Sequence, residues 1–157
     1  LYKLARSHLG RDPRGDEFEP STWMMMQEGF TTTGIDYADA IAVIHAQTRR
    51  FAAGMGNHDI LLVPTLLAAP PEFGILDQPR ATTREFFDVE FAHTGWTCMA
   101  NVTGWAAISV PVGLTNNGLP IGVQLIAPEE TILLQLAAQL ELAMPWDDRR
   151  PPGWVGC

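Results

Sequence analysis

An uninterrupted apolar run, Ile60-Leu61-Leu62-Val63-Pro64, constrains the fold of this chain more than any other feature. The run lies between turn signals, because Gly56-Asn57 precedes it and a segment rich in proline follows it. Hydrophobic residues at consecutive positions indicate a strand that is buried on both faces, the pattern typical of a parallel sheet covered by helices. The run therefore predicts a sheet with helices packed against it.

Periodic patterns predict helices around this strand. Apolar residues recur at helical spacing over residues 36–52, and Thr33-Gly34-Ile35-Asp36 offers a capping box at the start of that helix. The first half of residues 83–101 is also expected to be helical, up to Gly95, and residues 129–142 form a last helix that Pro145 ends. Residues 10–34 are rich in turn signals, with a short apolar patch at Trp23-Met24-Met25-Met26.

Two further runs predict a β-hairpin. Residues 106–112 and 120–126 read as strands, and Asn117-Gly118 between them is a strong hairpin signal. Residues 66–83 hold Pro70, Pro71, Gly74 and Pro79, which excludes a long helix or a central strand and predicts a long loop. With no internal repeat, this order of elements predicts a mixed α/β fold.

Composition narrows the class of protein. At 157 residues the chain is one domain or a piece of a larger one. Its net charge of −8 provides no large positive field, so we expect no direct nucleic-acid partner. Cys98 and Cys157 are the only cysteines and imply no disulfide framework, which favours the reducing cytosol. No apolar run approaches the ~20 residues that span a bilayer, so no membrane partner is expected.

Four ordered motifs resemble the C-terminal part of the amidase signature family. Asp59–Thr65 is similar to the family's "DxLLxPT" strand, Asn101–Pro111 to "NxTGxPAxSxP", and Gly118–Ile126 to "GLPxGxQxI". Pro145-Trp146 followed by Arg149-Arg150-Pro151 resembles the usual close of the family. The resemblance covers roughly residues 36–151 and departs at Ala106 and Ala127. It implies that residues 36–157 are the C-terminal part of an amidase domain, with residues 1–35 as an irregular or helical lead-in.

The resemblance implies a mixed β-sheet flanked by helices and a serine hydrolase that acts on linear or cyclic carboxamides. In that family a nucleophilic serine works through a second serine, in a cis peptide, to a lysine base. Ser7, Ser21 and Lys3 lie in no matching context, and Ser109 lies in a family motif that does not hold the nucleophile. No catalytic residue is therefore assigned, and the triad is expected upstream of this chain. No spacing typical of a metal site, a phosphate loop or a dinucleotide cofactor is present, so we expect neither metal nor cofactor.

We expect the chain to supply a wall of the substrate pocket, with Thr65, Trp96, Cys98 and Asn101 as the candidate residues that touch a small amide. An inert buried thiol is the simpler interpretation of Cys98, against a thiol nucleophile with His93 as base. The expected partners are that substrate, the missing N-terminal part of the same protein and, as a further option, a second copy in a homodimer. Two alternatives stay open: a subunit of a glutamine-dependent tRNA amidotransferase, and a non-catalytic binding module derived from an amidase.

Overall fold

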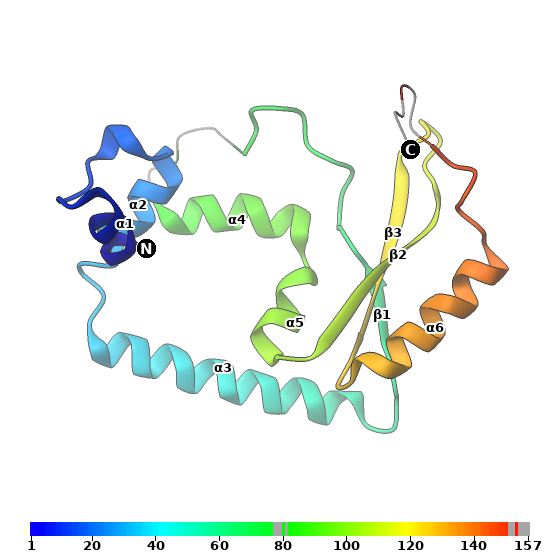
Figure 1. Cartoon of the computed structure of the whole chain (residues 1–157). Helices are drawn as coiled ribbons and strands as arrows, with labels where there is room; N and C mark the ends of the chain where they lie inside the picture. Colours follow the sequence, from blue (N-terminus) through cyan, green and yellow to red (C-terminus); the bar gives the residue numbers. More distant parts are fainter. Residues whose placement is uncertain (77–79, 81, 151–152, 154–157) are drawn as a thin grey trace. The chain divides into compact units, whose positions relative to one another are not determined.

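A computed structural model describes residues 1–76, 80, 82–150 and 153 of the chain. Pro79, Pro151 and Cys157, which the sequence analysis used, lie outside these described residues. The described chain separates into two compact units, residues 1–46 with 68–93 and residues 47–67 with 94–157. Figure 1 labels the helices and strands of both units.

The first unit is helical. It contains α1 (Tyr2–Leu9), a 3-10 helix (Gly15–Glu17), α2 (Pro20–Glu28), the first part of α3 and α4 (Thr83–Thr94). Helix α2 lies inside the segment that was expected to be rich in turns. It forms there because Pro20 occupies the first helical position, where its fixed φ is favourable and its missing N–H costs no bond. The methionine patch lies on this helix and buries Met26.

Helix α3 (Gly34–Met55) begins with the capping box that the sequence predicts. The Asp36 backbone N–H donates to Thr33 Oγ1 at 3.1 Å. The Asp36 carboxylate in turn accepts from the Thr33 backbone N–H at 2.8 Å and from the Thr33 hydroxyl at 2.7 Å. These bonds satisfy donors that the first helical turn leaves free, which fixes where the helix starts.

The second unit contains a three-stranded sheet in the order β1-β3-β2. The strands are β1 (Leu61–Pro64), β2 (Ala106–Leu114) and β3 (Pro120–Ala127), and both pairs are antiparallel. The expectation that β1 belongs to a parallel arrangement is therefore wrong. The pairing with β3 is long-range, and a run of apolar residues carries no information about the direction of its neighbour.

The β2–β3 hairpin is confirmed, with a longer loop than a two-residue Asn-Gly turn. Leu114 pairs with Pro120, and the Thr115 backbone N–H donates to Leu119 O at 2.8 Å. The Gly118 N–H donates to Thr115 O at 2.9 Å, which closes a turn over residues 115–118. Gly118 has φ +79°, a conformation that glycine adopts without the cost other residues meet.

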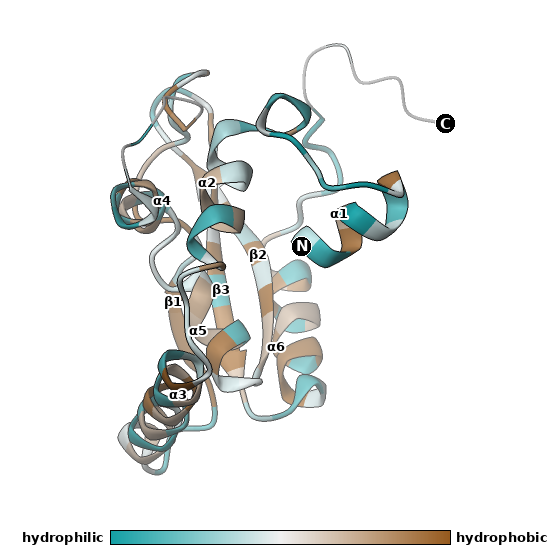
Figure 2. Ribbon diagram, turned by 90° about the vertical axis from the view of Figure 1, so that its left-hand side faces the viewer, coloured by the Kyte–Doolittle hydropathy of each residue, from teal (hydrophilic) through white to brown (hydrophobic). Residues whose placement is uncertain are grey.

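An apolar core lies between the sheet and α6 (Glu130–Ala143). Leu133 and Ala137 of α6 pack against Val110, Leu125 and Ala127 of β2 and β3. Figures 1 and 2 show α6 on one side of the sheet and α5 (Thr97–Thr103) on the other. In Figure 2 much of the sheet and of α6 has the colour of hydrophobic residues.

Strand β1 is not buried on both faces in this chain, which corrects the second expectation for residues 60–64. Val63 is buried, whereas Leu62 has 58% of its surface exposed. The register places Leu62 opposite Leu125, so both point to the side of α6. Helix α6 packs mainly on β2 and β3, which leaves Leu62 of β1 largely uncovered.

Helix α5 follows Gly95 and was not predicted, because Gly95 indicates an end and not a new beginning. Gly95 has φ +50°, and a Cβ atom at this position would lie 2.4 Å from Leu67 Cγ. The side chain of Leu67 thus packs over a bare backbone, and the chain turns there from α4 into α5. No helix in the described part of the chain is both long and apolar enough to cross a membrane.

Candidate functional site

The sheet face that points away from α6 carries a cluster of polar side chains. Side chains alternate along each strand, and residues directly opposite each other on antiparallel strands share a face. The register pairs Val63 with Gln124 and Ser109 with Gln124, and the Thr65 backbone N–H donates to Gly122 O at 3.0 Å. Thr65, Gly122, Gln124 and Ser109 therefore lie together on this face, and we call these four residues the polar strip.

Thr65, at the end of β1, is joined to Ser109 of β2 across the intervening strand β3. Their hydroxyl oxygens are 2.6 Å apart, and either hydroxyl is able to donate in this bond. Gly122 makes the contact possible, because a Cβ atom there would lie 3.0 Å from Thr65 Oγ1 and 3.1 Å from Ser109 Oγ. The glycine at this position allows two strands that are not neighbours to share a hydrogen bond.

Gln124 is the only buried polar residue of this sheet in the described chain. Only 7% of its surface is exposed, and its Oε1 atom has no hydrogen-bond partner among the described residues. Leaving such an acceptor unpaired costs on the order of 1–3 kcal/mol, and native proteins seldom do so. The strip therefore holds a hydroxyl pair and, beside it, a buried carbonyl oxygen without a described partner.

The other three predicted site residues lie on or just before α5. Trp96 directly precedes the helix and has 42% of its surface exposed. Cys98 Sγ donates to Gly95 O at 3.3 Å, and Asn101 Nδ2 donates to Thr97 O at 3.2 Å. These bonds are local to α5. The packing of Leu67 over Gly95 brings the segment after Thr65 beside the start of α5, while no described hydrogen bond links Thr65 to the other three residues.

Cys98 and His93 show no sign of a thiolate–imidazole pair. His93 Nδ1 is 2.9 Å from Val89 O, one turn back along α4, and the Cys98 thiol is engaged with Gly95 O. Within the described ranges, no group of three or more His, Cys, Asp or Glu side chains is arranged to hold a metal ion.

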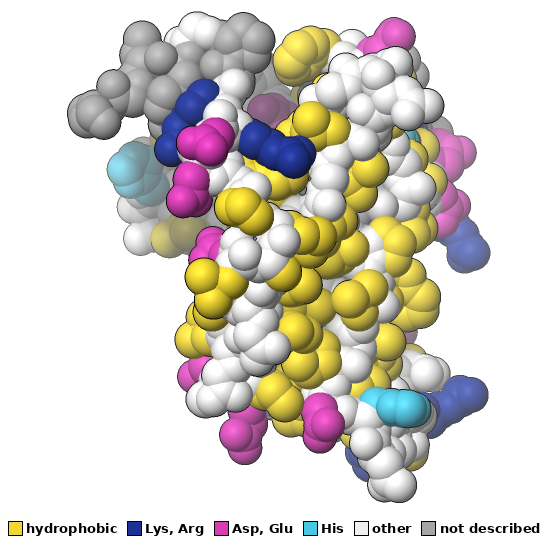
Figure 3. Space-filling model, turned by 90° about the vertical axis from the view of Figure 1, so that its right-hand side faces the viewer, with side chains coloured by type: hydrophobic (Ala, Val, Ile, Leu, Met, Phe, Trp, Pro, Cys, Tyr) yellow, Lys and Arg dark blue, Asp and Glu magenta, His cyan; other side chains and the backbone are white. Residues whose placement is uncertain are grey.

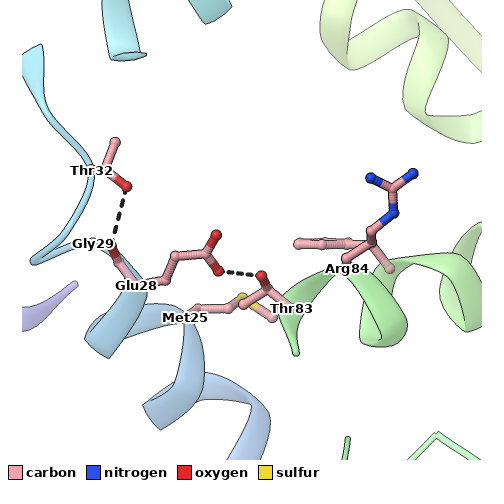
Figure 4. Close-up of a pocket in the computed structure, with 7 residues that line it drawn as sticks. Met25, Glu28, Gly29, Thr32, Thr83 and Arg84 are labelled. Carbon is pink, nitrogen blue, oxygen red and sulfur yellow. Dashed lines mark hydrogen bonds between the residues drawn. The ribbon is translucent and has the colours of Figure 1, made fainter. Parts of the chain in front are cut away.

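A separate pocket lies in the helical unit, between α2 and α4. Met25, Glu28 and Gly29 line it from α2 and the residue after it, with Thr83, Arg84 and Phe87 from α4. Figure 4 shows the Glu28 carboxylate accepting a hydrogen bond from the Thr83 hydroxyl and the Arg84 guanidinium pointing away from Glu28. In this pocket the Glu28 carboxylate is therefore engaged by the Thr83 hydroxyl.

Among the described residues, the carboxylates with displaced pKa values are Glu17 and Asp36. Hydrogen bonds from the Arg11 side chain and then the Arg14 backbone lower the pKa of Glu17 to about 2. The Thr33 hydroxyl and then the Thr33 backbone N–H lower the pKa of Asp36. Both shifts have a structural cause, namely an ion pair on the surface and a helix cap.

Known structures define the class of fold. The chain superposes on the structure of a 6-aminohexanoate cyclic dimer hydrolase with a TM-score of 0.84, at 31% identity over 96% of this chain. A structure of such a hydrolase complexed with substrate gives a TM-score of 0.83, again at 31% identity over 96% of this chain. The match covers 33% of each of these solved chains.

The sequence places the chain in a family. The Amidase family matches residues 6–131, and the chain belongs to this family. The match begins at residue 6, so the likeness extends into the lead-in region, where the motifs gave little signal. The 6-aminohexanoate-cyclic-dimer hydrolase of Paenarthrobacter ureafaciens is 35% identical over 156 residues, which cover 91% of this chain and 31% of the relative. The chain therefore spans about a third of the length of this relative.

Sequence reasoning named Thr65 and missed the rest of the polar strip. Ser109 was weighed only as a candidate nucleophile, and Gln124 was noted only as a position of the "GLPxGxQxI" motif, without a role in the site. A signal was present, since Gly122 and Gln124 are two residues apart and therefore share a strand face. Which side chains join them from β1 and β2 depends on the register, and no local pattern contains that information.

Proposed function

We propose that this chain is the C-terminal part of an amidase that hydrolyses the C–N bond of a carboxamide. The family match over residues 6–131 carries the proposal, and the activity for which the relatives are named supports it. The proposed triad is a serine, a second serine in a cis peptide and a lysine, all supplied by the part of the protein upstream of these residues. Residues 36–157 then form the C-terminal part of the amidase domain.

The chemistry needs all three groups. A serine hydroxyl is a weak nucleophile until a base takes its proton, and a lysine acts as that base only when its pKa is depressed. The serine oxygen attacks the amide carbonyl, backbone N–H groups stabilise the oxyanion, and the amine leaves with a proton. Water then releases the acid. Lys3 and the three serines of this chain take no part in these steps.

The proposed substrate is an uncharged, partly apolar amide, either linear or cyclic. The apolar loop from Leu66 to Gly74 and the aromatic residues of the chain support this choice, as does the cyclic amide after which the relatives are named. Thr65, Trp96, Cys98 and Asn101 are proposed to line the pocket.

We also propose the reducing cytosol as the compartment, from the low number of cysteines.

Activity measured on two preparations tests the proposal. The protein encoded by the full reading frame is expected to hydrolyse uncharged cyclic and linear amides, whereas the pure 157-residue chain is expected to release no amine. Ser21→Ala in the full protein serves as a control and is expected to keep full activity. Hydrolysis by the 157-residue chain alone would show that the assignment of the triad is wrong, and a preference for charged amides would overturn the substrate class.

The pocket residues are tested by substitution in the full protein. Trp96→Ala is expected to raise KM for apolar amides more than it lowers kcat, because an exposed aromatic side chain of a pocket wall contributes binding that is uniform along the reaction. Trp146→Ala is the matched control, because Trp146 follows α6 and lies beside the loop of the β2–β3 hairpin. Equal changes of KM in the two variants would show that Trp96 does not line the pocket.

A further inference from the structure

The pocket between α2 and α4 carries two opposite charges that do not pair with each other. Glu28 lines it from the end of α2, and Arg84 lines it from the first turn of α4. Among the described residues, no ion pair joins these two side chains or engages either one. Figure 4 shows the Arg84 guanidinium directed away from the Glu28 carboxylate. The pocket therefore holds a separate negative group and a separate positive group.

Both charged groups have hydrogen-bonding capacity to spare. The Thr83 hydroxyl donates to Glu28 Oε2, whereas Glu28 Oε1 has no partner in the described part of the chain. The Arg84 guanidinium has five N–H donors, and none of them is used by a described residue. Each charge is thus able to bind a ligand group without first giving up a bond inside the protein.

Apolar side chains share the pocket with these charges. Met25 is half-buried, Phe87 has 37% of its surface exposed, and both line the pocket. The pocket volume of about 510 Å³ is in the range that holds small ligands. A carboxylate, a guanidinium and an apolar surface beside them match a ligand that has an ammonium group, a methylene chain and a carboxylate.

Ring opening of a cyclic amide makes a ligand of this kind. Hydrolysis breaks the C–N bond, and water adds its OH to the acyl carbon and its other hydrogen to the nitrogen. In a cyclic amide both new groups stay on one molecule. At neutral pH the amine is protonated and the acid is ionised, because their ordinary pKa values are about 10 and about 4. The product is therefore a linear amino acid with one charge of each sign.

We propose that this pocket binds a linear ω-amino acid, the product class of cyclic-amide hydrolysis, with the ammonium group on Glu28 and the carboxylate on Arg84. The methylene chain lies against Met25 and Phe87. The inference rests on the proposed function, because the class of ligand is taken from the reaction proposed for the full protein. All of these contacts come from the helical unit, so one compact unit supplies the complete set.

The methyl group of Met25 reports on binding of 6-aminohexanoic acid in this pocket of the full protein. Labelling of the methionine methyl groups with carbon-13 makes its NMR signal visible, and Met25→Leu identifies it. Titration is expected to shift the Met25 signal until it saturates. The signal of Met144 is the control and should not move, because Met144 follows α6 and does not line this pocket. An unshifted Met25 signal would overturn the inference.

Charge substitutions test the two contacts. Glu28→Gln and Arg84→Gln are each expected to raise the dissociation constant about three- to fivefold, the effect of one exposed ion pair. Glutamine at residue 28 still accepts the Thr83 hydrogen bond, so the contact between the two helices is kept. Asp88→Asn and Arg50→Gln, at exposed positions that do not line the pocket, are the matched controls and should leave the dissociation constant unchanged.

Ligands with a single charge test which side chain holds which end. Hexanoic acid keeps only the carboxylate, so Arg84→Gln should weaken its binding and Glu28→Gln should not. Hexylamine keeps only the ammonium group and should show the reverse dependence. Equal affinity of 6-aminohexanoic acid for the wild-type protein and for both charge variants would overturn the inference, as would the opposite dependence of hexanoic acid.

Amide hydrolysis by the same preparations separates this inference from the function on which it rests. A full protein that hydrolyses cyclic amides but shows no shift of the Met25 signal contradicts the pocket assignment alone. A full protein that binds 6-aminohexanoic acid at Met25 and hydrolyses no amide contradicts the proposed function alone.

Discussion

The lack of a side chain at Gly122 allows the side chains of two other residues to form a hydrogen bond. The hydroxyls of Thr65 and Ser109 belong to strands that are separated by β3, yet they lie 2.6 Å apart. They meet in the space that a Cβ atom at residue 122 would occupy. A hydrogen bond across the sheet therefore depends on a residue that has no side chain.

Gly122→Ala is expected to destabilise the protein by about 1–3 kcal/mol, because the new methyl group crowds two hydroxyls that are themselves bonded. Gly113→Ala on β2 is the matched control, since nothing lies within 4 Å of a Cβ atom there, and a change within about 0.5 kcal/mol is expected. Urea unfolding measures the free energy of unfolding of both glycine variants. Adding Ser109→Ala should recover part of the loss, and equal midpoints for the two glycine variants would contradict the packing described here.

At the scale of the element, α3 depends on a cap that also sets its response to acid. The Thr33 hydroxyl and backbone hold the pKa of Asp36 below its ordinary value of 3.8. The pKa of Asp36 is thus lower in the folded than in the unfolded protein, and the ionised carboxylate stabilises the helix. This stabilisation is fully present above about pH 4 and is lost as the pH falls through the folded pKa.

Thr33→Ala is expected to cost about 1 kcal/mol at neutral pH, the usual value for a helix N-cap. Asp36→Asn should remove part of the loss of stability below pH 4, because residue 36 then no longer takes up a proton. Unfolding free energies measured between pH 2 and pH 7 by circular dichroism check both variants. Asp39→Asn on the same helix is the control. If its unfolding free energy changed with pH in the same way as that of Asp36→Asn, the role of the cap would be contradicted.

At the scale of the whole molecule, much apolar surface of the second unit is uncovered. Figure 3 shows hydrophobic side chains gathered over the side where α6 lies. Leu62, Leu134 and Leu142 are 58%, 59% and 87% exposed. Strands β1 and β2 each pair only with β3 in the described sheet, so each has an open edge as well. Open edges and apolar patches of this kind favour association.

The isolated 157-residue chain is therefore expected to self-associate as its concentration rises, which sedimentation velocity measures. Leu134→Glu combined with Leu142→Glu should shift the chain toward monomer, because both side chains are exposed and neither packs in the core. Leu133→Glu is the contrasting variant and should unfold the chain, since Leu133 is buried against the sheet. A wild-type chain that stays monomeric and melts cooperatively would instead support the independent binding module.

Much of the secondary structure follows from short stretches of sequence. The cap of α3, the β2–β3 hairpin and helix α6 were predictable, because each depends on residues within about four positions of one another. Helices α2 and α5 were missed, since proline and glycine mark both the ends and the beginnings of helices. The amidase motifs were readable for the same local reason, and the family match over residues 6–131 covers the first three of them.

The sequence by itself thus determined most of the local elements and the family of this protein. Only the tertiary structure decided the direction of β1, the exposure of Leu62 and the meeting of Thr65 with Ser109 over Gly122. The physical reason is that these features arise from pairing between residues more than forty positions apart in the chain. Such pairing is fixed by the register and by what covers each face, and neither is encoded in the spacing of neighbouring residues.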